Sequence, residues 1–116
     1  LVPPSNPTGG VITRETAERL AELAVRHNFV IISDEIYGKF VWRPFEHVSM
    51  ASLPGMAERT VTLSGFSKAY AMTGWRVGYV LAPENAVRAM AATKAQTTGP
   101  VATLSQRASR AAAEGG

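Results

Sequence analysis

Apolar positions between residues 13 and 28 recur every three or four residues, a spacing that predicts an amphipathic helix. Thr13 suits the N-cap of this helix, and Asn28 suits the position at which it stops. Five side chains share the expected apolar face: Ala17, Leu20, Leu23, Ala24 and His27. We therefore expect this face to pack on a core, with His27 as a core or capping residue.

Three short runs rich in apolar and β-branched residues predict strands at 29–33, 60–64 and 76–82. The first two runs have the composition of strands that are buried on both faces. Helical patterns follow at 83–97 and 102–113. This alternation of strands and helices predicts an α/β fold with a mainly parallel sheet.

Polar side chains stand directly after the predicted strands and in the proline- and glycine-rich turn that precedes the first helix. Asp34 follows one strand and Lys68 follows the next, so the two would meet at one rim if these strands are parallel. Asn6, Tyr37 and Arg76 are further candidates. Taken singly, each has a plain structural explanation as a turn residue, a helix cap, a half-buried aromatic or a surface charge.

Composition limits the possible functions. The chain has 116 residues, 46% of them hydrophobic, which is typical of one small globular domain. The net charge of +3 is scattered, and no apolar run is long enough to span a bilayer, so we expect neither nucleic-acid nor membrane partners. The lack of cysteine fits a reducing compartment, and we expect a cytoplasmic protein.

Several classes of catalytic site lack their residues. Only Asp34 and Glu35 are neighbouring carboxylates, and His27 and His47 have no partner at a metal-ligand spacing, so we expect no metal site. A Ser-His-Asp triad lacks a histidine candidate near a strand-end serine. The glycine-rich P-loop of nucleotide hydrolases is absent from the sequence.

One kind of cofactor, a phosphorylated pyridine aldehyde, would use all five polar candidates. An amine forms a Schiff base with its aldehyde, and a carboxylate pairs with the protonated ring nitrogen. A phenol and an amide can hydrogen-bond the ring oxygen, while a guanidinium and serine hydroxyls hold the phosphate. Because a protonated amine cannot attack an aldehyde, we expect Lys68 to lie in a dry setting without a permanent carboxylate partner.

Three motifs resemble the class I/II aminotransferases, which are pyridoxal-phosphate-dependent enzymes of fold type I. These motifs are "NPTGG" at 6–10, "SDEIYGKF" at 33–40 and "SGFSKAYAMTGWRVG" at 64–78, and they occur in the order of the family. The resemblance implies cofactor-binding roles for seven residues: Asn6, Asp34, Tyr37, Ser64, Ser67, Lys68 and Arg76.

The resemblance also implies what each of these residues does. Lys68 would be the catalytic Schiff-base lysine, and Asp34 would pair with the ring nitrogen. Tyr37 and Asn6 would contact the ring hydroxyl, while Arg76 and a serine would hold the phosphate. Ser67 and Ser64 are the serine candidates, and Gly65 stands where some members of the family carry a serine.

By the same resemblance, residues 1–116 would be a fragment of the cofactor-binding large domain, an incomplete three-layer α/β/α unit, with an N-terminal segment and a C-terminal small domain outside it. The intact enzyme would be a homodimer that moves an amino group between an α-amino acid and a 2-oxo acid, and the fragment alone would be inactive. The motif sequences most resemble those of aspartate- and aromatic-type aminotransferases. Two alternatives stay open: a C–S β-lyase of the same fold, and an aminotransferase-like sensor domain of a transcription regulator.

Overall fold

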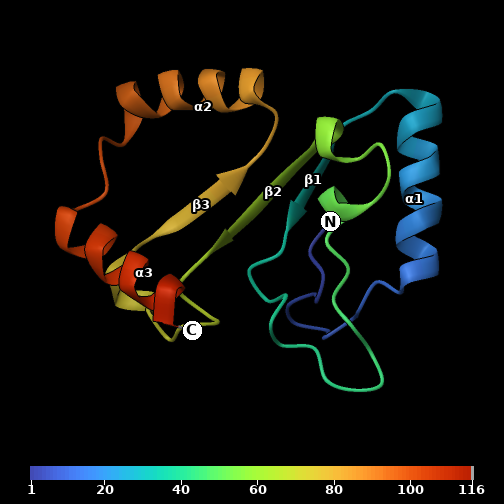
Figure 1. The fold of residues 1–116 in the computed structure, drawn as a ribbon, viewed down its shortest axis with the longest axis horizontal. Coiled ribbons are helices and arrows are strands. Elements are labelled where there is room, and N and C mark those ends of the chain that lie inside the picture. Colours follow the sequence, from blue (N-terminus) through green and yellow to red (C-terminus); the bar gives the residue numbers. More distant parts are fainter. Residues whose placement is uncertain (116) are drawn as a thin grey trace.

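The computed structural model describes residues 1–115, which form three helices and one three-stranded sheet (Figure 1). The elements follow one another as α1 (Arg14–His27), β1 (Ile31–Asp34), β2 (Thr60–Gly65), β3 (Gly78–Leu81), α2 (Glu84–Thr97) and α3 (Thr103–Gly115). Single turns of 3-10 helix occur at Met50–Ser52, Ala57–Arg59 and Thr73–Trp75. The predicted order of strands and helices is confirmed.

Helix α1 begins and ends where its capping residues predict. The Thr13 side chain accepts a hydrogen bond from the Thr16 amide, and Asn28 closes the helix in the left-handed conformation, with φ of 51°. Ala17 and Ala24 are buried as predicted, Ala21 is buried beside them, and Leu20 packs partly buried against the core. Leu23 and His27 point to solvent instead of the core.

The sheet has the order β1-β2-β3 and is mixed. Strands β1 and β2 run parallel, with Asp34 opposite Leu63, while β3 runs antiparallel to β2, with Gly78 opposite Gly65. The difference from a mainly parallel sheet has a local cause. The segment between β2 and β3 contains no helix longer than one turn, whereas a parallel return needs a long crossover connection.

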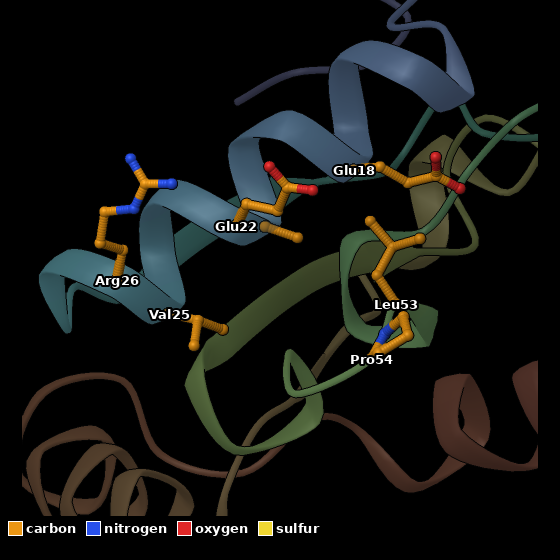
Figure 2. A pocket seen from close by; sticks show the side chains of 7 residues that line it. Glu18, Glu22, Val25, Arg26, Leu53 and Pro54 are labelled. Atoms are coloured by element: carbon orange, nitrogen blue, oxygen red, sulfur yellow. The ribbon is translucent and has the colours of Figure 1, made fainter.

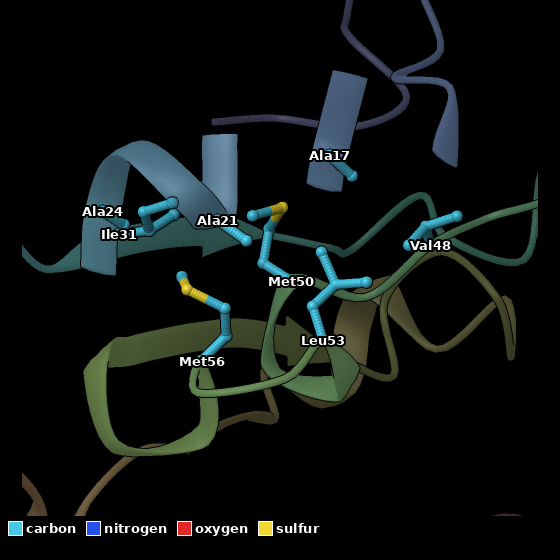
Figure 3. Close-up of a cluster of buried hydrophobic side chains, with 8 residues drawn as sticks. All are labelled: Ala17, Ala21, Ala24, Ile31, Val48, Met50, Leu53 and Met56. Atoms are coloured by element: carbon cyan, nitrogen blue, oxygen red, sulfur yellow. The ribbon is translucent and has the colours of Figure 1, made fainter. Parts of the chain in front are cut away.

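The hydrophobic core lies between α1, β1 and the segment before β2 (Figure 3). The small side chains of α1 let the helix approach closely, and two methionines fill the space beneath it. Met50 and Met56 are almost completely buried. The core members are Ala17, Ala21, Ala24, Ile31, Val48, Met50, Leu53 and Met56.

The strands are not covered on both faces within residues 1–115. Ile32 in β1 is 59% exposed, and Leu81 in β3 is 61% exposed. The radius of gyration is 15.3 Å, against about 13 Å for a compact domain of this length. The chain therefore forms a partial α/β domain. Nowhere in this described part is a helix both long and apolar enough to cross a membrane.

Candidate functional site

The parallel pairing of β1 and β2 brings Asp34 and Lys68 to the same end of the sheet. Asp34 is the last residue of β1, and Lys68 follows the last residue of β2 by three positions. The two strands are parallel, as the prediction of a shared rim required. Asp34 Oδ1 accepts a hydrogen bond of 3.1 Å from the Ile36 amide, which holds the carboxylate against the following turn.

Asn6, Tyr37 and Lys68 come together at this rim. Asn6 Nδ2 donates to the Tyr37 hydroxyl at 3.4 Å, and Lys68 Nζ lies 5.7 Å from the centre of the Tyr37 ring. An amide, a phenol and an amine from three separate segments therefore meet beside the end of β1. This is the donor set that the sequence predicts around a pyridine ring and its aldehyde.

The segment that carries Asn6 is held beside β1 by backbone hydrogen bonds. The Leu1 backbone nitrogen donates to Ile32 O at 2.9 Å, and the Asp34 amide donates to Leu1 O at 2.9 Å. A further bond of 2.9 Å from the Ser5 amide to Gly10 O closes the turn around Asn6. The two bonds of Leu1 attach the segment to the edge of β1 that does not face β2, and they thereby position Asn6.

Lys68 begins a tight turn that follows β2. The Ala71 amide donates to Lys68 O at 3.0 Å, and the Met72 amide donates to Phe66 O at 3.2 Å. Lys68 is exposed, so residues 1–115 alone do not form the dry setting that we expect around it. In that same part of the chain no carboxylate forms a salt bridge with Lys68.

Arg76 does not join the group around Tyr37. Its backbone is left-handed, with φ of 54°, and its guanidinium donates to Thr73 O at 3.2 Å. The side chain lines a hollow of about 460 Å³ between this turn and the connection from α2 to α3. Lys94 lines the same hollow, which therefore carries two cationic groups.

The two serine candidates lie in different places. Ser64 points to the face of the sheet opposite that of Asp34, because Asp34 pairs with Leu63 and side chains alternate along a strand. There Ser64 lines a hollow of about 250 Å³ together with Glu35. Ser67 lies directly before Lys68, and its carbonyl oxygen accepts a hydrogen bond from the Thr73 hydroxyl.

Comparison with known proteins decides the family. The family model described as Aminotransferase class I and II matches residues 2–116. The chain belongs to this family. The aminotransferase chain is 48% identical over 113 residues to a bifunctional aspartate aminotransferase and glutamate/aspartate-prephenate aminotransferase of Petunia hybrida, covering 97% of this chain and 24% of the relative. It is 52% identical over 87 residues to aromatic-amino-acid aminotransferase 2 of Thermococcus litoralis, covering 75% and 22%.

Solved structures agree with this assignment. The crystal structure of an aromatic aminotransferase from Pyrococcus horikoshii OT3 superposes with a TM-score of 0.89 at 42% identity, covering 96% of the aminotransferase chain and 30% of that structure. A Thermotoga maritima aspartate aminotransferase superposes with a TM-score of 0.84 at 40% identity, covering 90% and 28%. The chain spans about a quarter of the length of the curated relatives it matches.

A buried polar group beside the site was missed by sequence reasoning. Glu35 of the aminotransferase chain is 9% exposed, and its carboxylate is hydrogen-bonded to His47 Nε2 at 3.0 Å. The two residues are twelve positions apart in a loop, a separation that no helical or strand period identifies. The only signal was the position of Glu35 directly after Asp34, which places it on the other face of the sheet.

A larger hollow lies away from the group around Tyr37. It is a groove of about 540 Å³ between α1 and the segment that follows Met50 (Figure 2). Its lining residues are Glu18, Ala21, Glu22, Val25, Arg26, Leu53 and Pro54. None of the predicted site residues of the aminotransferase chain lines it. Within residues 1–115, no three His, Cys, Asp or Glu side chains gather as a metal ion would require.

Proposed function

We propose that this chain is part of the cofactor-binding large domain of a pyridoxal-phosphate-dependent aminotransferase. The enzyme moves an amino group between an α-amino acid and a 2-oxo acid. The observation that carries the proposal is the meeting of Asn6, Tyr37 and Lys68 beside Asp34, at the carboxyl end of a parallel strand pair. Membership of the class I and II aminotransferase family supports the same reading.

The side chains present at the rim fit the chemical groups of pyridoxal phosphate. The carboxylate of Asp34 suits a protonated ring nitrogen, and the phenol of Tyr37 with the amide of Asn6 suits the ring oxygen. Arg76 lies apart from this group, in the hollow that it shares with Lys94, and we assign it and Ser67 to the phosphate by the family resemblance. When bound, the cofactor supplies an electron sink that acidifies the Cα–H bond of the amino acid.

Lys68 performs the two roles of the reaction that need an amine. Its Nζ would hold the cofactor through the aldehyde group. With the amino acid bound, Lys68 Nζ would take the proton from Cα as general base and later give it up as general acid. The salt-bridge-free setting of Lys68 within the described residues supports this role, because a carboxylate partner would keep the amine protonated.

The substrates we propose are acidic or aromatic amino acids, because the relatives named above act, by their names, as aspartate, glutamate/aspartate-prephenate or aromatic aminotransferases. These names favour amino transfer over the C–S β-lyase and over the sensor domain of a transcription regulator. We also propose a homodimeric, cytoplasmic enzyme, following the family resemblance and the absence of cysteine.

The test uses the enzyme that contains this chain, loaded with pyridoxal phosphate. Borohydride reduction should fix the cofactor on the peptide that contains Lys68, and Lys68→Ala should leave that peptide unlabelled. Lys39→Ala, which removes another exposed lysine of the same region, should keep the label. A label that persists in Lys68→Ala would contradict the role given to Lys68.

Asp34 is tested by its effect on turnover. Asp34→Ala should abolish most transamination of aspartate or phenylalanine with 2-oxoglutarate while some cofactor binding remains, because the carboxylate stabilises the positive ring nitrogen that draws electrons from Cα. Oxo-acid formation is followed spectrophotometrically. Turnover close to that of the unaltered enzyme would rule out this function for Asp34. Thiol release from a cysteine conjugate, without amino transfer, would support the β-lyase instead.

A further inference from the structure

Glu35 is a buried carboxylate in the middle of the segment that carries Asp34 and Tyr37. It lies on the opposite face of the sheet from Asp34 and is 9% exposed. A buried carboxylate is costly unless hydrogen bonds and charges compensate it. The partners of Glu35 therefore show what this charge holds in place.

All the partners of the Glu35 carboxylate come from one short segment, residues 47–50. Glu35 Oε2 is hydrogen-bonded to His47 Nε2 at 3.0 Å. Glu35 Oε1 accepts from the Ser49 hydroxyl and from the Met50 amide, both at 3.2 Å. The carboxylate thus links the end of β1 to the segment that enters the hydrophobic core at Met50.

The backbone of Glu35 is fixed as well. Its amide donates to Leu63 O at 2.8 Å, which extends the pairing of β1 with β2 by one residue. Its carbonyl oxygen accepts from the Gly38 amide at 2.9 Å, which closes the turn around Tyr37. The orientation of Tyr37 at the rim therefore depends on the turn that Glu35 anchors.

The His47 ring packs directly on this turn. A Cβ atom at Gly38 would lie 2.9 Å from both Cδ2 and Nε2 of His47, closer than real Cβ contacts occur. The ring thus fits between the Glu35 carboxylate and the backbone of Gly38. His47 restrains the turn from the face opposite the cofactor residues.

We propose that Glu35 is a positioning residue for the cofactor. Through His47, Ser49 and the Met50 amide it fixes the turn at residues 34–38, so that Asp34 and Tyr37 are held at the rim in a single orientation. This inference rests on the proposed function, because it assigns the turn to pyridoxal phosphate. The simpler alternative is that Glu35 only attaches segment 47–50 to the sheet and affects stability alone.

The experiment compares variants of the enzyme that contains this chain. Glu35→Gln removes the charge and gives His47 an amide in place of a carboxylate oxygen, while an acceptor remains for Ser49 and Met50. His47→Asn and Gly38→Ala disturb the same contact from the other side. Glu46→Gln is the matched control, because it replaces a carboxylate by an amide at an exposed position next to His47.

Two measurements report on the cofactor itself. The dissociation constant of pyridoxal phosphate is measured by absorbance titration, and visible circular dichroism reports how the bound ring is oriented. We expect Glu35→Gln and His47→Asn to raise the dissociation constant about tenfold, the size of effect known for groups that orient the ligands of a bound metal ion. Both variants should also weaken the dichroic band. The control Glu46→Gln should match the unaltered enzyme in both measurements.

The outcomes separate the two proposals. If the unaltered enzyme binds no pyridoxal phosphate, the proposed function falls, and this inference with it. If it binds, and Glu35→Gln and His47→Asn keep its dissociation constant and dichroic band while urea unfolding shows lost stability, the positioning role alone is overturned. Should Glu35→Gln fail to fold, His47→Asn and Gly38→Ala decide by the same two measurements, because His47 is partly exposed.

Discussion

Gly65 of β2 lies in close backbone contact with the start of β3. A Cβ atom at this position would lie 2.9 Å from Gly78 Cα and 2.9 Å from Val77 O. Both neighbours are backbone atoms, so no side-chain rotation can relieve the contact. Strand β3 would have to retreat by about half an ångström to restore ordinary contacts, which stretches its pairing with β2.

We therefore expect Gly65→Ala to lower the free energy of unfolding by about 1–3 kcal/mol, the usual cost of overpacking a close contact. Urea unfolding of the enzyme that contains this chain measures the loss. Gly65→Ser, which introduces the residue that some family members carry there, should cost at least as much.

Gly74→Ala is the matched control for this experiment. A Cβ atom at Gly74 would meet nothing within 4 Å, and the backbone of Gly74 is not left-handed. The control should be neutral or more stable by up to about 1 kcal/mol, since alanine reduces the freedom of the unfolded chain. Equal unfolding free energies for Gly65→Ala and Gly74→Ala would refute the steric reasoning.

Two further predictions concern the stability of the chain. Thr13→Ala removes the side-chain cap of α1 and should cost about 1 kcal/mol in urea unfolding of the enzyme; an unchanged midpoint would mean that the cap is not stabilising. Residues 1–116 alone should aggregate or unfold without cooperativity and should not transaminate, because Ile32 and Leu81 leave apolar surface open. A cooperative calorimetric transition together with oxo-acid formation by the isolated chain would contradict this.

Features set by neighbouring residues could be predicted from the sequence. The ends of α1 follow from the side chain of Thr13 and the left-handed tolerance of Asn28, both of which act within one helical turn. The prediction that Asp34 and Lys68 lie at the same rim required only the ends of two strands and the assumption that these strands are parallel. The family resemblance implied that Asn6 and Tyr37 both contact the ring hydroxyl, and the structure brings these two side chains within 3.4 Å of each other.

Features set by distant residues could not be predicted. An apolar run predicts burial in a complete sheet, but Ile32 is exposed because nothing in residues 1–115 covers its face. The direction of β3 depends on the length of the turn before it. The pairing of Glu35 with His47 depends on how a loop returns to the sheet, and the placement of Arg76 depends on a left-handed backbone at a residue other than glycine.

The position of the core along the chain has a consequence for the order of folding. Within residues 1–115, the residues of the core cluster all lie between Ala17 and Met56, so they leave the ribosome before Lys68 does. Their contacts join α1, β1 and the segment before β2, which are close in sequence and can form early. We expect this unit to consolidate without the cofactor. The lysine then emerges next to a surface that is already in place.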